Sequence, residues 1–255
     1  MREKTKTIFI ICLGGWLLLS TTLVTIFVFG NPIQRAVIGM GWGLIILWIF
    51  TIGPLMVRYR ESIKGLVQGI KIRWQIKFIV FATLLALLEE AITVSMTNAA
   101  PLFGVKIGEA YITASTNYLD VVFFHSVIAF IPLFIGWAWV LTRYQFSPFE
   151  VFLLFGITGT LAEAGYGGIQ HLREFGLWIF VYGLMIYLPA YTIPEERGAK
   201  PIRFWDYLIA IPYTYVVGIP FYILFGLMNH LIFHHSGKMR NPVISRRLGP
   251  RLSPG

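Results

Sequence analysis

Long apolar segments recur along this chain, separated by short polar connections. The first covers residues 7–30 and follows a short basic stretch. A helix needs about 20 apolar residues to cross the hydrocarbon core of a bilayer, and this segment is long enough. A secretory signal would have a shorter apolar core and a small-residue cleavage site, so we expect a first membrane-spanning helix here instead.

Six further segments have the length and composition of membrane spans. They cover residues 36–57, 76–98, 119–141, 149–170, 177–193 and 206–235. Residues 58–77 are basic with apolar positions near helical spacing, which fits either an in-plane amphipathic helix or a solvated loop. Residues 99–118 are too polar and too interrupted by glycine and proline to cross, so we expect a loop or a re-entrant lip. Pro212 and Pro220 are expected to kink or break the last segment, and a break would add an eighth crossing.

The composition is that of a membrane protein. Only 13% of the 255 residues are charged, against about 25% in soluble domains, and 56% are hydrophobic. The net charge of +9 comes from basic residues in connections and tails, which is typical of cytoplasmic loops facing anionic lipid and not of nucleic-acid binding. We therefore predict an all-α, polytopic bundle of seven or eight transmembrane helices. One membrane domain is expected over residues 1–235, with a basic, disordered tail over residues 236–255.

The distribution of lysine and arginine predicts which side of the membrane holds the N-terminus. With seven spans and a cytoplasmic N-terminus, 13 basic residues lie inside and 8 outside. An eighth crossing would change these counts to 18 and 3. Both counts favour a cytoplasmic N-terminus, because cytoplasmic loops carry the excess of basic residues. The sequence leaves the choice between seven and eight spans open, and with it the side on which the basic tail lies.

Two adjacent glutamates, Glu89 and Glu90, interrupt the third apolar segment. At 100° per residue they share an arc of about 100° with Thr93 and Thr97, so we expect one polar stripe that faces the bundle interior. A charged side chain at the centre of a spanning helix costs roughly 2.5–3.5 kcal/mol on insertion scales, and such residues usually have a function. Neighbouring carboxylates repel each other, so one is expected to stay protonated, as a general acid would. The alternative is a hydrogen-bonded pair that only holds helices together.

Two more ionisable residues, His125 and Glu163, lie at a similar depth in other apolar segments. Measured from the expected helix ends, Glu90, His125 and Glu163 each lie roughly 21 Å from the inner surface of a core about 30 Å thick. Three helices would therefore bring ionisable side chains to one level in the outer half of the bilayer. Alone, His125 would be interpreted as a satisfied interior histidine, but beside two glutamates it becomes a candidate for catalysis.

Two histidines near the end of the last apolar segment are candidate metal ligands. His230 and His234 are four residues apart, so both imidazoles can lie on one face of a helix. With the carboxylate of Glu163 they form a candidate ligand set for zinc. The alternative is a pair of interfacial histidines at a helix end, and no cofactor at all.

The pattern of a Glu-Glu pair, a histidine after phenylalanines in the next segment and a late histidine-bearing helix resembles the type II CAAX prenyl protease superfamily and its PrsW-type relatives. In that superfamily, an intramembrane glutamate and histidines activate water for peptide-bond cleavage. The resemblance implies that the glutamate motif falls on Glu89 and Glu90, the following histidine on His125, and the late histidine motif on His230 with His234.

Two positions depart from the pattern of that superfamily. Val94 stands where the glutamate motif has arginine or lysine, and Val121 stands where the histidine motif has phenylalanine.

These features lead to three hypotheses about function. The first is an intramembrane, protease-like hydrolase of a membrane-embedded peptide or a lipid-like substrate. Glu90 or Glu89 would be the general base that activates water, and His125 its partner or a stabiliser of the oxyanion. The second is a proton- or cation-coupled transporter that uses Glu90 and Glu163. The third is a non-catalytic membrane subunit whose polar residues hold helices together. The expected partner is the lipid bilayer, and the oligomeric state stays open.

Overall fold

The computed structural model describes residues 3–235, except for the side chains of residues 166, 225 and 228–235. Every regular element in this range is a helix, so the all-α prediction is confirmed for it. The elements are α1 (Glu3–Phe27), α2 (Pro32–Leu44), the π-helix η1 (Ile45–Ile52), α3 (Gly53–Gly69), α4 (Trp74–Asn98), the 3₁₀-helix η2 (Ala100–Phe103), α5 (Tyr118–Phe124), α6 (Ser126–Arg143), α7 (Pro148–Gly167), the 3₁₀-helix η3 (Ile169–Glu174), α8 (Phe175–Tyr191) and α9 (Phe204–His235).

The chain divides into two compact units, residues 1–218 and 219–255. The first unit contains α1 to α8 and the first part of α9, and every contact described below lies within it. The expected tail over residues 236–255 lies outside the described residues. The single membrane domain expected over residues 1–235 stays a prediction.

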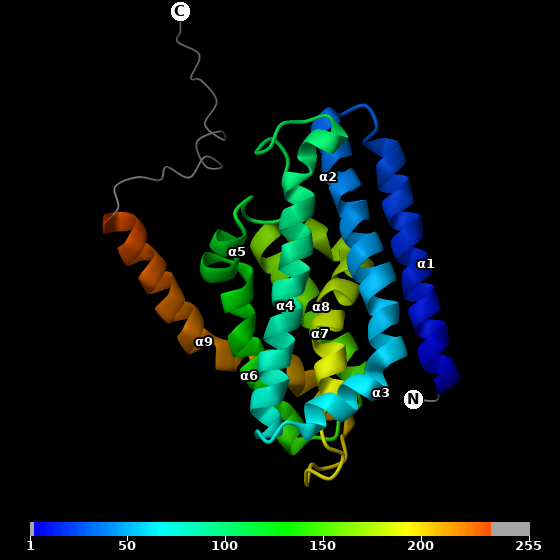
Figure 1. Cartoon of the computed structure of the whole chain (residues 1–255), viewed down its shortest axis with the longest axis vertical. Coiled ribbons are helices and arrows are strands. Elements are labelled where there is room, and N and C mark those ends of the chain that lie inside the picture. The colour runs from blue at the N-terminus through cyan, green and yellow to red at the C-terminus, as the bar shows by residue number, and fades with distance from the viewer. Residues whose placement is uncertain (1–2, 236–255) are drawn as a thin grey trace, which may run out of the picture. The chain divides into compact units, whose positions relative to one another are not determined.

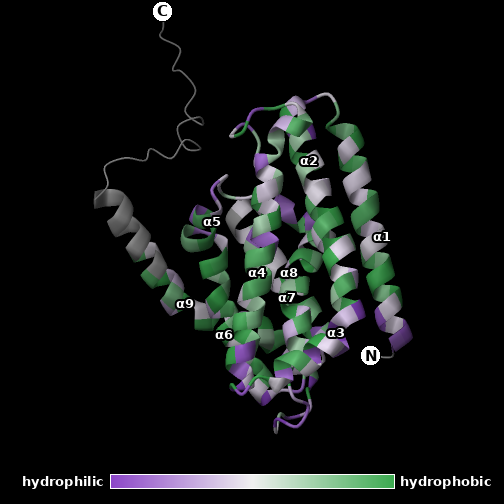
Figure 2. Cartoon of the chain, in the orientation of Figure 1, coloured by the Kyte–Doolittle hydropathy of each residue, from purple (hydrophilic) through white to green (hydrophobic). Residues whose placement is uncertain are grey.

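Six stretches of helix among the described residues are long and apolar enough to cross a membrane, as predicted for a multi-pass integral membrane protein. They cover Glu3–Phe27, Pro32–Gly69, Trp74–Asn98, Ser126–Arg143, Ile169–Tyr191 and Phe204–Leu224. Hydrophobic residues line α1, α2 and α4, and hydrophilic residues gather near the start of α1 and along α3 (Figure 2). The expected span over residues 149–170 forms α7, which is not among the six because glutamates, threonines and glycines make it less apolar.

The second span is longer than the sequence predicts. α2, η1 and α3 form one helical path over Pro32–Gly69, and only residues 70–73 connect it to α4. Residues 58–69 are therefore helical, and the alternative of a solvated loop is wrong for them. The polar side of α3 contacts the chain just after α8: Lys64 Nζ lies 3.3 Å from Glu195 Oε1, and Gln68 Nε2 donates to the Thr192 carbonyl at 3.1 Å.

Two other segments differ from their expected form. The fourth expected span is broken, because α5 ends at Phe124, α6 begins at Ser126, and His125 between them has φ −134° and ψ −104°. The last segment is one continuous helix, α9, that contains Pro212 and Pro220. The hairpin that would have added an eighth crossing is therefore not formed.

The first unit has one end that is rich in basic residues, which we call the basic end. In Figure 1 the starts of α1 and α4 lie at this end together with the end of α3. The α6–α7 and α8–α9 connections lie there too. Its described basic residues are Lys4, Lys6, Arg58, Arg60, Lys64, Lys71, Arg73, Lys77, Arg143, Arg197, Lys200 and Arg203. The opposite end has the α1–α2 connection, the loop over residues 104–117 and η3, with Arg35, Lys106 and Arg173.

α7 and α8 approach each other more closely than larger side chains would allow. A Cβ atom added at Gly156 would lie 2.7 Å from the Cα and carbonyl oxygen of Ile179, and one added at Gly183 would lie 2.7 Å from the carbonyl oxygen of Phe152. Small residues at such contacts are typical of helix packing in membranes. α8 also packs against α4, and α4 against α6, so these four helices together surround the buried polar residues described next.

Candidate functional site

Glu89 and Glu90 are both buried in the middle of the helix bundle, with only 4% and 5% of their surfaces exposed. They lie on α4, whose apolar sequence favours a buried helix. The predicted polar stripe continues one helical turn further on with Thr93, which is also buried. The Thr93 hydroxyl lies 2.9 Å from both the carbonyl oxygen and the carboxyl Oε1 of Glu89. This hydroxyl offsets part of the cost of burying the first carboxyl group.

The carboxyl group of Glu90 faces the loop over residues 104–117 and the start of α6. Thr113 Oγ1 donates to Glu90 Oε2 at 3.3 Å, and the Ser126 side chain lies close to the same carboxyl group. The loop is held in place by bonds to α4: Asn98 Nδ2 donates to the Thr116 carbonyl at 2.8 Å. The second glutamate is therefore covered from the end of the unit opposite the basic end.

Glu163 on α7 accepts a hydrogen bond from the hydroxyl of Tyr182 on α8. The glycines between these helices make this contact possible, because a Cβ atom at Gly159 would overlap the ring of Tyr182. The ring of Tyr182 also stacks on Trp178, with centroids 5.9 Å apart. A buried tyrosine usually finds a partner for its hydroxyl, and here the partner is a carboxyl group.

Glu163 lies close enough to Glu89 and Glu90 to interact electrostatically with both. We call these three residues the carboxyl cluster. It joins side chains from α4 and α7 and is linked to α8 through Tyr182. In the part of the chain that the structure describes, the cluster has hydroxyl donors but no ion pair with a lysine, arginine or histidine. Such a group can accept protons, bind a cation, or orient and deprotonate a water molecule.

His125 lies at the break between α5 and α6, next to Ser126, which contacts Glu90. Its Nε2 atom lies 3.8 Å from Oδ2 of Asp120, and 40% of its side-chain surface is exposed. The ring of His125 thus pairs with Asp120 on α5, while the side chain of the next residue, Ser126, lies close to the carboxyl cluster. Asn117 caps the start of α5, because its Oδ1 accepts hydrogen bonds from the backbone amides of Leu119 and Asp120 at 3.0 and 3.4 Å.

The proposed zinc ligands are only partly described. His230 and His234 belong to α9, but their side chains lie outside the described residues, and Glu163 binds Tyr182. Among the described side chains, no three of histidine, cysteine, aspartate or glutamate are placed to hold a metal ion. The zinc site stays a prediction.

Two residues of the site do not follow from the sequence pattern. Tyr182 lies in an apolar, aromatic segment, where nothing distinguishes it from the packing residues around it. Thr113 lies in a loop whose path over α4 depends on tertiary contacts. The one available signal in the sequence is the phenol itself, since a tyrosine buried among apolar side chains needs an acceptor for its hydroxyl.

Comparison with known protein families, with curated proteins and with solved structures finds no match to this chain.

Proposed function

We propose that this membrane protein is an intramembrane hydrolase in which Glu90 is the general base. The observation that supports the proposal is the surroundings of Glu90: a buried carboxyl group that meets two hydroxyl groups at a helix break, beside a histidine paired with aspartate. A base, an orienting hydroxyl and a histidine–carboxylate pair are the parts that a hydrolytic site requires.

In the proposed reaction, Glu90 takes a proton from water, and the water oxygen attacks the carbonyl carbon of a membrane-embedded peptide or lipid-like ester. The bond between that carbon and the leaving nitrogen or oxygen then breaks, and the proton passes from Glu90 to the leaving group. His125, oriented by Asp120, would stabilise the negative oxygen of the intermediate. The negative charges of Glu89 and Glu163 would help Glu90 to accept the proton from water.

The test follows oxygen from water into the product. Full-length protein in nanodiscs is incubated with membrane peptides and with lipid extract in ¹⁸O-labelled water, and products are analysed by mass spectrometry. We expect wild type to add one ¹⁸O atom to a product carboxylate, and Glu90→Gln to do so about 10²–10⁴-fold more slowly, the usual contribution of a general base. The matched control is Glu196→Gln, an exposed carboxyl group at the basic end, which should behave like wild type.

Equal labelling by wild type and Glu90→Gln would contradict the proposal, as would no labelling by wild type with any substrate fraction. A thermal unfolding measurement on each variant separates loss of chemistry from loss of folding. If Glu90→Gln loses stability and nothing else, the carboxyl cluster has only a structural role.

A second candidate function is a proton- or cation-coupled carrier. It is favoured by the extent of the carboxyl cluster, which continues from Glu90 through Glu89 to Glu163 and Tyr182, and by the interrupted α5–α6 helix beside it. Interrupted helices often form the binding sites of transporters. Protein in liposomes with an internal pH dye would then show proton uptake that Glu163→Gln abolishes, without any ¹⁸O-labelled product.

A further inference from the structure

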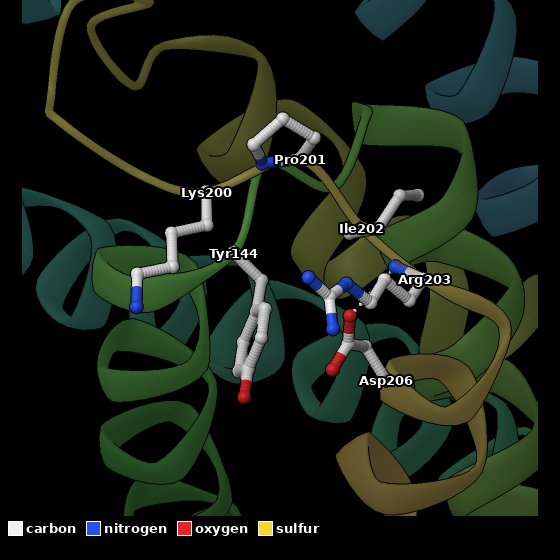
Figure 3. Close-up of a pocket in the computed structure, with 6 residues that line it drawn as sticks. All are labelled: Tyr144, Lys200, Pro201, Ile202, Arg203 and Asp206. Carbon is white, nitrogen blue, oxygen red and sulfur yellow. Dashed lines mark hydrogen bonds between the residues drawn. The ribbon is translucent and has the colours of Figure 1, made fainter.

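A cavity of about 440 Å³ opens at the basic end, where α6 ends and α9 begins. Figure 3 shows the side chains around it, which are Tyr144, Lys200, Pro201, Ile202, Arg203 and Asp206. A second cavity of about 230 Å³ shares Tyr144 and Lys200 and adds Arg143 to the lining. The linings of these two neighbouring cavities include three basic side chains, Arg143, Lys200 and Arg203, and we call the two cavities together the basic pocket.

The backbone on one side of the basic pocket is fixed by bonds between two distant segments. The Lys200 amide donates to the Arg143 carbonyl at 2.9 Å, and the Gln145 amide donates to the Lys200 carbonyl at 2.9 Å. Arg197 adds three bonds, to the carbonyl oxygens of Leu141, Pro194 and Tyr144, at 2.8, 3.1 and 3.4 Å.

Arg197 has the role of holding this connection in place. Burial lowers the pKa of its guanidinium, but an arginine stays protonated at neutral pH, so all its bonds persist. The backbone at Lys200 is thus positioned before any ligand arrives.

The one acidic residue in the lining, Asp206, offsets only one of the three positive charges, and its carboxylate caps a helix. Asp206 Oδ2 accepts the backbone amide of Arg203 at 2.6 Å, a cap for the start of α9 that is drawn as a dashed line in Figure 3. Within the described range, neither Lys200 nor Arg203 has a carboxylate within ion-pair distance. The pocket therefore presents positive charge without a partner.

The basic pocket lies where two candidate membrane spans end and begin. α6 and α9 are both candidate spans, and the pocket is at the end of one and the start of the other. Trp139 and Tyr213 stack with centroids 4.1 Å apart, and the Arg143 guanidinium lies 4.0 Å from the centroid of the Trp139 ring. Tryptophan, tyrosine and arginine in this combination are typical of the membrane–water interface.

Exposed apolar side chains adjoin the pocket on α9. Phe204 is 70% exposed, Trp205 67% and Leu208 53%. A soluble phosphate ester would gain nothing from these residues, but the acyl chains of a lipid would cover them. Basic pockets between helices at the cytoplasmic face are known to bind the headgroups of anionic lipids.

We propose that the basic pocket binds the phosphate of an anionic phospholipid, with Lys200 and Arg203 on the phosphate and the acyl chains against the start of α9. This site lies apart from the carboxyl cluster, and its existence does not depend on the function proposed for that cluster.

The test is a lipid titration of full-length protein in an uncharged detergent, followed by native mass spectrometry. The probes are dioleoyl phosphatidylglycerol, dioleoyl phosphatidylcholine and free glycerol phosphate. We expect phosphatidylglycerol to bind most tightly, and Lys200→Gln and Arg203→Gln each to weaken it about fivefold, the contribution of one basic residue near an anionic surface. Lys200→Arg should retain binding. The controls are Lys71→Gln, at the basic end outside the pocket, and Lys106→Gln, at the opposite end, both of which should bind like wild type.

Three outcomes would overturn the proposal. The first is unchanged phosphatidylglycerol binding by the double variant Lys200→Gln/Arg203→Gln. The second is binding of phosphatidylcholine as tight as that of phosphatidylglycerol. The third is binding of glycerol phosphate as tight as that of the lipid, which would indicate a soluble ligand. A melting curve that matches wild type must accompany each variant, so that weaker binding is not due to unfolding.

Discussion

A single hydroxyl group explains how α7 can carry a carboxyl group inside the helix bundle. Glu163 accepts a hydrogen bond from the phenol of Tyr182, and this phenol lies within the bundle because glycine at position 159 leaves room for its ring. A polar group buried without a partner costs about 1–3 kcal/mol in protein mutational data. The energetics of the site thus depend on one tyrosine that contributes no charge.

We expect Tyr182→Phe to destabilise the protein by about 1–2 kcal/mol, because it removes the hydrogen-bond donor to the partly buried carboxyl group of Glu163. Thermal unfolding in detergent measures the effect. In a double-mutant cycle with Glu163→Gln, the two changes should not add, since they share one hydrogen bond.

Tyr213→Phe is the control for this cycle. The Tyr213 ring stacks on Trp139, but its hydroxyl makes no hydrogen bond within the described residues, so stability should not change. Strict additivity of Tyr182→Phe and Glu163→Gln would show that the bond contributes nothing.

The acidic residues of the site could be predicted from the sequence, and their partners could not. Carboxyl groups inside apolar segments stand out in any sequence, and helical periodicity places Glu89 and Glu90 on an inward face. Which residue faces them depends on helix packing and loop paths that no local pattern contains. His125 shows the same limit: its depth was predicted, but the helix break at its own position directs its ring toward Asp120.

At the scale of the elements, α7 and α8 depend on their glycines. Ile179 presents backbone atoms to Gly156, and backbone cannot move aside without separating the helices. Gly165 lies on the same helix with no atom within 4 Å of its added Cβ position. The two positions therefore offer a matched pair of substitutions on one helix.

We expect Gly156→Ala to cost about 1–3 kcal/mol, the usual range for overpacking a tight contact. Gly165→Ala should be neutral or stabilising by up to about 1 kcal/mol, since alanine favours helix over glycine. Chemical or thermal unfolding of the two variants side by side is the measurement. Equal effects would mean that α7 and α8 can separate at little cost.

Hydropathy predicted that most of the helices exist, but it predicted the first and last residues of fewer of them. Long apolar runs are visible in the sequence because a bilayer-spanning helix has no alternative to apolar side chains. A helix over residues 58–69 was one of the two alternatives, but its continuity with the second span was missed, since the contacts of Lys64 and Gln68 with the chain after α8 have no local pattern in the sequence. The break at His125 was also missed, because no proline or glycine marks it in the sequence.

At the scale of the whole molecule, the distribution of charge predicts orientation. The basic end has twelve described lysines and arginines and the opposite end three. Cytoplasmic loops carry the excess of basic residues, so the basic end should face the cytoplasm. This would also place the basic pocket against the leaflet that is rich in anionic lipid.

Cysteine labelling in intact cells tests this orientation. In a Cys12→Ala background, a membrane-impermeant maleimide should label Lys106→Cys from outside and should reach Lys71→Cys only after permeabilisation. Both lysines are exposed, so their accessibility differs by side and not by burial. Labelling of Lys71→Cys alone in intact cells would reverse the assignment.

The bond between Glu163 and Tyr182 also has a consequence for how the chain is made. A carboxyl group is costly in a helix that enters lipid alone, by up to about 3 kcal/mol at the helix centre, and α7 is less apolar than the other spans. Its partner emerges from the ribosome only after η3. We therefore expect α7 and α8 to enter the lipid together as one hairpin, because the hydrogen bond between them lowers the cost of burying the carboxyl group.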